Sequence, residues 1–177
     1  MAIIIALSAL AANNSFAQYN EIKSENIASL QVVAGNNWLS MPIATLNGEA
    51  INISFDDLTH EYHRYVYRLQ HCEADWSVSE GIFESDYCEG FADGSTIDDI
   101  EESLNTNTLY THYRLSIPNE NCRIKMSGNY RLTVYDENEG DTVFTACFMV
   151  VEPLVKTSME VTTNTDIDTN KAHQQVA

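Results

Sequence analysis

The sequence predicts an all-β protein: an immunoglobulin-like β-sandwich of about seven antiparallel strands, with one long acidic, aromatic-containing excursion. From Glu25 onward, apolar and polar residues alternate with a period close to two, as expected for a sheet with one buried face. Turn-forming residues recur at short intervals, and helical periodicity is scarce. With 44% apolar and 10% aromatic residues, the 177-residue chain has the composition of a packed globular domain.

Residues 1–17 differ from the rest and predict a signal peptide. Small and aliphatic residues fill 2–12, and Ser15 and Ala17 stand at the −3 and −1 positions of the expected cleavage site. The apolar run is too short for a membrane span, which needs about 20 residues. A buried first strand or helix is the alternative. The usual basic n-region is missing, which is expected if the true start lies upstream of Met1 or if part of the leader is absent. We expect the mature chain to begin at Gln18 in an exported compartment.

The alternation places seven strands in the chain that follows. They cover 27–33, 38–41, 50–55, 63–71, 111–117, 129–135 and 143–151. Asn47-Gly48 and Gly140 mark hairpin turns. Pro42 and Pro153 stand where the edge or end of a strand tolerates a missing hydrogen-bond donor.

The same alternation predicts which side chains face the core, at every second position of five strands. They are Ile51, Ile53, Phe55, Tyr65, Tyr67, Leu69, Tyr113, Leu115, Ile117, Tyr130, Leu132, Val134, Phe144, Phe148 and Val150.

Residues 73–110 form the excursion, 38 residues between two expected strands, which is long for a sandwich connection. It holds 11 acidic residues, and no Lys or Arg occurs between Arg68 and Arg114. Aromatic residues interleave with these charges, so we expect the excursion to pack onto the sandwich. It is either a functional loop or a cap on one end of the core with solubilising carboxylates.

The β-sandwich domain is expected over 18–155. The tail, 156–177, is rich in Thr, Asn and Asp, which is typical of a linker. We expect it to lead into a second domain that is missing here, and a frayed C-terminus is the alternative.

The charge and the motifs exclude several functions. A formal net charge of −17 and a pI near 4.4 oppose binding to the phosphates of nucleic acid. The sequence has no GxSxG elbow, no cysteine in a catalytic context and no glycine-rich phosphate loop. We expect no enzyme activity, no catalytic residue and no cofactor.

The sequence contains two clusters of potential metal ligands. Asp56, Asp57, His60 and His63 lie within eight residues, but polar turn residues between strands explain them as well. Residues 136–141 loosely resemble a calcium loop but lack its regular alternation, so a charged hairpin is the better interpretation. We expect no bound metal.

Cys72, Cys88, Cys122 and Cys147 give an even count, and three pairings are possible in an oxidising compartment. The sequence does not choose among them. Small buried apolar residues are an equal alternative for each.

Three stretches carry a resemblance to a known family. They read His71-Cys72-Glu73-Ala74-Asp75-Trp76, Tyr87-Cys88-Glu89-Gly90-Phe91 and Tyr110-Thr111-His112-Tyr113-Arg114-Leu115. They resemble the N-terminal domain of the plug protein of the Bacteroidota type IX secretion system. Residues 127–130 and 148–153 are similar to later strands of that family, and the likeness covers roughly 27–176.

The resemblance implies a periplasmic protein that seats against the periplasmic opening of an outer-membrane β-barrel translocon and closes it when idle. From the net charge and the short apolar run, we expect no nucleic-acid partner and no membrane-spanning segment in the mature chain. We expect the excursion to be the docking surface, with Asp75, Trp76, Tyr87 and Phe91 as partner-binding residues. Alternatively, Trp76 belongs to the core and Asp75 caps a turn.

Polar residues on the expected strands have a structural interpretation. His71, His112, Tyr113 and Arg114 are expected to form a structural polar network between strands. The rival function is an exported β-sandwich binding module for glycan or peptide, and a metal-dependent hydrolase is a third hypothesis.

Overall fold

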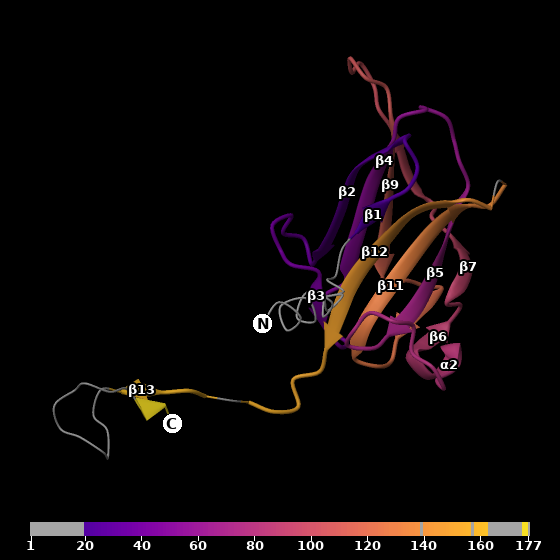
Figure 1. Ribbon diagram of the computed structural model, residues 1–177. Coiled ribbons are helices and arrows are strands. Elements are labelled where there is room, and N and C mark those ends of the chain that lie inside the picture. The colour runs from indigo at the N-terminus through magenta and orange to yellow at the C-terminus, as the bar shows by residue number, and fades with distance from the viewer. Residues whose placement is uncertain (1–19, 139, 157, 163–174, 177) are drawn as a thin grey trace, which may run out of the picture.

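The structure is a computed structural model that describes residues 20–138, 140–156, 158–162 and 175–176. The expected signal peptide and most of the expected linker lie outside the described residues. Two packed sheets form a β-sandwich, which confirms the predicted fold class (Figure 1).

The first sheet has six strands and is built around a central antiparallel trio. The trio consists of β5 (Tyr65–Cys72), β11 (Gly128–Asp136) and β12 (Thr142–Val151). β7 (Asp93–Thr96) extends it beyond β5, and β1 (Glu21–Ile22) pairs with β12. β3 (Ile43–Thr45) runs parallel to the last residues of β12.

The second sheet has four strands in the order β2, β4, β9, β8. Their bounds are β2 Ile27–Ala34, β4 Ile51–Asp57, β9 Thr111–Ile117 and β8 Asp99–Glu102. Two small antiparallel pairs complete the strands. They are β6 (Cys88–Gly90) with β10 (Cys122–Ile124), and β13 (Val161–Thr162) with β14 (Gln175–Val176).

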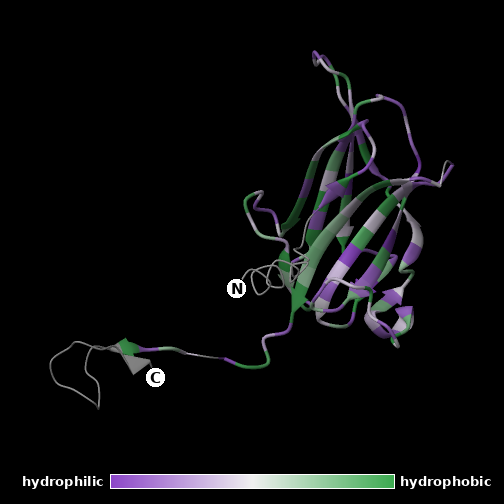
Figure 2. Ribbon diagram, viewed as in Figure 1, coloured by the Kyte–Doolittle hydropathy of each residue, from purple (hydrophilic) through white to green (hydrophobic). Residues whose placement is uncertain are grey.

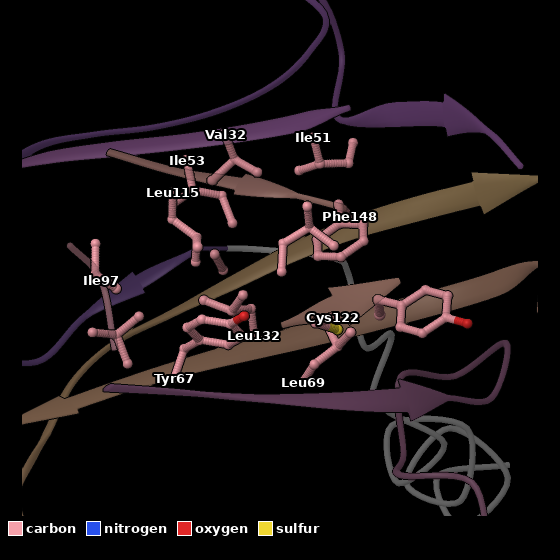
Figure 3. Close-up of a cluster of buried hydrophobic side chains, with 14 of the residues drawn as sticks. Val32, Ile51, Ile53, Tyr67, Leu69, Ile97, Leu115, Cys122, Leu132 and Phe148 are labelled. Atoms are coloured by element: carbon pink, nitrogen blue, oxygen red, sulfur yellow. The ribbon is translucent and has the colours of Figure 1, made fainter. Parts of the chain in front are cut away.

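The core lies between the inner faces of the two sheets. All fifteen side chains predicted to face inward are buried, which confirms the period-two assignment. Figure 2 shows the matching alternation of hydrophobic and hydrophilic bands along the strands, and Figure 3 shows Ile53 and Leu115 facing Tyr67 and Leu132 across the core. The Phe55 ring stacks on Tyr113 at 5.1 Å and meets Phe144 of the opposite sheet edge-on at 4.9 Å.

The strand predicted at 38–41 is wrong. The amide of Leu39 donates to the side chain of Asn37 (3.1 Å) and the amide of Ser40 to the Asn37 carbonyl (2.9 Å), so a turn forms instead. The apolar side chains of Trp38, Leu39 and Met41 are exposed in this turn and do not face the core. The strand in this region is β3, which begins after Pro42.

The described residues contain fourteen strands, more than the expected seven. Six of the seven expected strands are present as β2, β4, β5, β9, β11 and β12, and the others are short. The Asn47-Gly48 turn exists, but it joins β3 to β4, which belong to different sheets, so the hairpin predicted there is wrong. The hairpin at Gly140 between β11 and β12 is confirmed, with the glycine amide bonded to the Asp136 carbonyl.

The excursion packs onto the sandwich, as predicted. It leaves the first sheet after β5 and forms the one-turn helix α2 (Glu84–Tyr87), then β6 and β7, and enters the second sheet as β8. Tyr87, Ala92 and Ile97 from this segment are part of the core. The excursion therefore lengthens both sheets by one strand. No helix in the described part of the chain has the length and apolarity required to cross a bilayer.

The Phe55→Ala substitution should lower the free energy of unfolding by about 3–5 kcal/mol, because the ring contacts both sheets and its removal leaves a cavity. Denaturant unfolding measures the change. Phe83→Ala is the matched control, since the Phe83 ring is 76% exposed, and it should change stability by less than about 0.5 kcal/mol. Equal effects of the two variants would contradict this core assignment.

Candidate partner-binding surface

Asp75 lies in the tight turn that follows β5. The Glu73 amide donates to the Ser77 carbonyl (2.8 Å), and the Trp76 amide donates to the Glu73 carbonyl (3.0 Å). The hydroxyl and the amide of Ser77 donate to the Asp75 carboxylate at 2.6 and 3.0 Å. These two bonds, the hydroxyl first, hold the pKa of Asp75 below its ordinary value. Asp75 therefore caps the turn as an exposed anion.

Trp76 is buried, but on the outer face of the first sheet and not in the core between the sheets. Its backbone adopts a left-handed conformation with φ at 67°, which turns the indole back onto the strands. The ring packs with Cys72 and Cys147, beside Met149. The Arg131 guanidinium donates to the Trp76 carbonyl and fixes the turn from the neighbouring strand. Trp76 thus supports the start of the excursion.

Tyr87 is also buried and attaches α2 to the sandwich. Its hydroxyl donates to the Leu69 carbonyl (3.0 Å), and its ring lies 6.1 Å from those of His71 and Tyr130. Burial raises the pKa of Tyr87 to about 12, so the phenol stays protonated as a donor. Tyr87 positions the backbone that carries its exposed neighbours.

Phe91 and Phe83 are the exposed aromatic residues of this region, with 69% and 76% of their surface accessible. The Phe91 amide donates to the Asn121 carbonyl (2.7 Å). A Cβ on Gly90 would lie only 2.1 Å from that carbonyl oxygen, and its φ is 106°, so the backbone is fixed by a position that only glycine fits. We call Phe83, Glu84, Glu89 and Phe91 the α2–β6 surface (Figure 1).

A second exposed apolar group lies in the loop between β2 and β3, which we call the Trp38 loop (residues 35–42). Trp38, Leu39 and Met41 are each about 70% exposed. Two hydrogen bonds from side-chain amides hold the loop. The Gln31 amide donates to the Trp38 carbonyl (3.1 Å), and the Asn52 amide donates to the Gly35 carbonyl (2.8 Å). Sequence reasoning missed this group because it expected a strand there. The flanking Asn36-Asn37 and Pro42 were the available signals of a loop.

The carboxylates of the excursion are mostly unpaired. Four of the eleven form ion pairs with an arginine: Glu89, Asp93, Asp99 and Glu101. Burial alone would raise the pKa of Asp93, but hydrogen bonds from Arg68 and Tyr135 lower it by more. The other seven carboxylates have no ion pair with any residue that the structure describes. This part of the surface is therefore strongly negative and suits a basic partner.

The potential metal ligands at 56–63 do not form one site, because their side chains contact different partners. Asp56 pairs with His112 (2.5 Å), while Asp57 is buried and accepts a hydrogen bond from Tyr65 (2.8 Å). Nδ1 of His63 lies 3.0 Å from the Asp136 carboxylate. Among the described residues, no three potential ligands are grouped to hold a metal ion.

His63 nevertheless joins the two sheets electrostatically, since Asp57 ends β4 and Asp136 ends β11. Burial lowers the pKa of His63, but the hydrogen bond with Asp136 and the charge of Asp57 raise it by more. The net pKa therefore lies above the ordinary value, and the charged imidazolium is stabilised in the folded state.

The remaining polar residues named from sequence make contacts between strands or from a strand to a loop. His71 bonds to the Ser79 hydroxyl (2.8 Å), and the Tyr113 hydroxyl donates to the His63 carbonyl (3.1 Å). Arg114 pairs with Asp99 on β8. These contacts are structural and leave the exposed aromatic residues as the candidates for binding.

The fold and these surfaces define an immunoglobulin-like β-sandwich domain with exposed apolar side chains on an acidic background, a class of domain that commonly binds other proteins. Residues 27–152 match the family described as the type 9 secretion system plug protein 1st domain, so the chain belongs to that family. The match spans the sandwich from β2 to the end of β12. Membership suggests a structural role in the secretion machinery and a location in the cell envelope.

The chain is also similar to a solved structure, a hypothetical protein from Parabacteroides merdae ATCC 43184 whose crystal structure was determined at 2.30 Å resolution. The two are 45% identical with a TM-score of 0.76, over 90% of this chain and 40% of that chain. This chain thus spans about 40% of the length of its structural relative. No curated protein matched.

The stability contributed by His63 should depend on pH. A histidine whose pKa is raised on folding contributes fully below its unfolded pKa of about 6.5, and this contribution is lost as pH rises through the folded pKa. The loss of unfolding free energy caused by His63→Gln should therefore be largest near pH 5.5 and shrink towards pH 8. Chemical denaturation across this range measures it.

Asp136→Asn provides the control, because it removes the carboxylate bonded to His63. In that background, His63→Gln should show a weaker dependence on pH. A cost of His63→Gln that stays constant from pH 5.5 to 8 would contradict the proposed ion pair.

Proposed function

We propose that this chain is the N-terminal part of a periplasmic plug protein that binds the periplasmic opening of the type IX secretion outer-membrane translocon and closes it when idle. The observation that carries the proposal is the family match across the whole sandwich, residues 27–152. A plug acts by occupying space, so the proposal assigns no catalytic residue and no cofactor to the chain.

The packing of the sandwich supports this role. A stopper must keep its shape, and here both sheets bury their inner faces against each other through rings such as Phe55, Tyr113 and Phe144. No buried side-chain nitrogen or oxygen of the described residues lacks a hydrogen-bond partner, which favours one well-defined conformation. The excursion is tied to both sheets through β7 and β8 and adds bulk to the sandwich.

We place the docking contact on the α2–β6 surface. Phe91 would supply the anchor, because exposed aromatic residues on a fixed backbone give most of the affinity in protein interfaces. Trp76 and Tyr87 would hold that backbone from beneath, and Asp75 would add to the negative charge around it. The unpaired carboxylates would steer the domain towards a basic rim on the translocon.

The organisation of the chain follows from the same proposal. Residues 1–17 would direct export and be removed, residues 18–155 would form the plugging domain, and residues 156–177 would lead to a second domain. The mature protein would then be periplasmic.

The rival hypothesis of a glycan or peptide module has no comparable support. Hollows of about 500 and 650 Å³ lie beside Tyr110 and Phe83, a size common for ligand pockets, but nothing in them identifies a ligand. The family match favours the plug, so we keep the binding module as an outcome of the test.

The test is co-purification of the full-length protein with the translocon from outer membranes of its host. Phe91→Ser should reduce the retained protein at least about tenfold, since an interface anchor contributes about 2 kcal/mol or more. Leu104→Ser, at a site that is 80% exposed on the connection from β8 to β9, is the matched control and should leave retention unchanged. Purified Phe91→Ser should keep the melting temperature of the wild type.

A strain without the protein should admit a large antibiotic that the outer membrane normally excludes, and restoring the full-length protein should reverse this. No association of the wild type with the translocon, together with millimolar or tighter carbohydrate binding, would overturn the plug proposal. Equal retention of the Phe91 and Leu104 variants would overturn the placement of the docking contact.

A further inference from the structure

Cys88 and Cys122 lie face to face in the core although 34 positions separate them in the sequence. Cys88 begins β6 and Cys122 begins β10, and the antiparallel register pairs Cys122 with Gly90 and Cys88 with Ile124. The two sulfur atoms are 2.9 Å apart, and the residues are 3% and 0% exposed. No disulfide bond joins the four cysteines, all of them among the described residues, in this structure.

The approach of the two strands is built into the backbone. The absence of a side chain at Gly90 lets the Asn121 carbonyl reach the Phe91 amide (2.7 Å), which draws the start of β10 against the end of β6. Figure 3 shows the Cys122 sulfur pointing into the core near Leu69 and Leu132. The close contact therefore results from the fold around it and not from two flexible side chains.

The other two cysteines are placed where they cannot form a disulfide bond. Cys72 on β5 is opposite Asn129, and Cys147 on β12 is opposite Arg131, so all of β11 lies between them. Two strand spacings amount to roughly 9–10 Å, beyond the Cα separation of about 7 Å that a disulfide tolerates. Each of the three pairings left open by the sequence contains two bonds, and the structure favours only one of these bonds, Cys88–Cys122.

The pair is also arranged for oxidation. Cys88 is one of the residues that line a surface hollow, together with Phe83, Glu89 and Lys125, whereas Cys122 is fully buried. The hydrogen bond between the two thiols lowers the pKa of Cys88 and raises that of Cys122. Because of its place beside the hollow, we assign the first attack to Cys88, which reacts as the thiolate.

We propose that Cys88 and Cys122 form a disulfide bond in the exported protein, with Cys72 and Cys147 remaining thiols. A protein or small-molecule disulfide is the oxidant. Cys88 attacks it and releases one thiol, and Cys122 then attacks the sulfur of Cys88 in the mixed disulfide and releases the second. Two protein thiols are oxidised, one disulfide is reduced, and the two protons of the cysteines end on the two released thiols.

The bond would fix the part of the excursion that carries Phe83 and Phe91. β6 and β10 share only three register pairs, so the small sheet has little stability of its own. A covalent link between its strands lowers the entropy of the unfolded chain and holds α2 and β6 against the sandwich. The chemistry does not depend on the plug function, because the isolated protein can be tested without a translocon.

The first experiment counts thiols in the purified mature protein. The reduced protein is exposed to oxidised glutathione, denatured and alkylated, and we expect two of the four cysteines to react, against four before oxidation. Peptide mapping without reduction should show one linked pair, Cys88 with Cys122. Four reactive thiols, glutathione retained on Cys88, or a linked peptide that contains Cys72 or Cys147 would overturn the proposal.

Matched double variants separate the two pairs of cysteines. Cys72→Ala with Cys147→Ala should show no reactive thiol after oxidation and two after reduction. Cys88→Ala with Cys122→Val, which keeps the core volume at position 122, should show two thiols under both conditions. A loss of thiols in this second variant would contradict the assignment of the pair.

The melting temperature tests the stabilising effect. Oxidised wild-type protein should melt roughly 10 °C above the reduced protein, as expected for a disulfide that closes a loop of this length in a domain of this size. The Cys72/Cys147 variant should keep this shift, and the Cys88/Cys122 variant should lose it. Equal melting temperatures of oxidised and reduced wild type would show that the bond does not stabilise the excursion.

Discussion

The mutual burial of the inner faces of the two sheets determines what the rest of this molecule can do. Phe55 reaches across to Phe144, and tyrosines from both sheets close around them, so the space between the layers is filled with side chains. In the described part of the chain, packing side chains therefore occupy the interior between the sheets. Recognition must use loops, sheet edges and outer faces, and these are the places where exposed aromatic residues occur.

The excursion illustrates how such a surface is kept rigid. It adds β7 to one sheet and β8 to the other, so the chain crosses between the layers while remaining hydrogen-bonded at both ends. Before β7, the hydroxyl of Tyr87 donates to the Leu69 carbonyl of β5 and anchors the short helix. Phe83 and Phe91 are therefore displayed on a framework that loses little entropy when a partner binds.

The sequence predicted the long strands and their buried faces well, because a period of two directly reflects which side of a sheet meets the core. It failed where neighbours distant in sequence decide the structure. β3 exists because the end of β12 offers it a parallel partner, and nothing local to Ile43–Thr45 announces that. Trp76 was expected in the interface or the core, but a left-handed turn lays it on an outer face. The contact of Cys88 with Cys122 depends on tertiary structure alone. The motif around Trp76 indicated the family. No family motif pointed to the exposed residues of the Trp38 loop.

The pairing of β3 with β12 has a mechanical consequence. Near its end, β12 is bonded to β11 on one side and to β3 on the other, and the amides of Leu46 and Met149 bond to the carbonyls of Val151 and Pro42. A pull on the chain beyond Val151 would run along β12 and load these bonds together in shear, instead of peeling them one at a time. The point where the polypeptide leaves the sandwich is thus reinforced against tension.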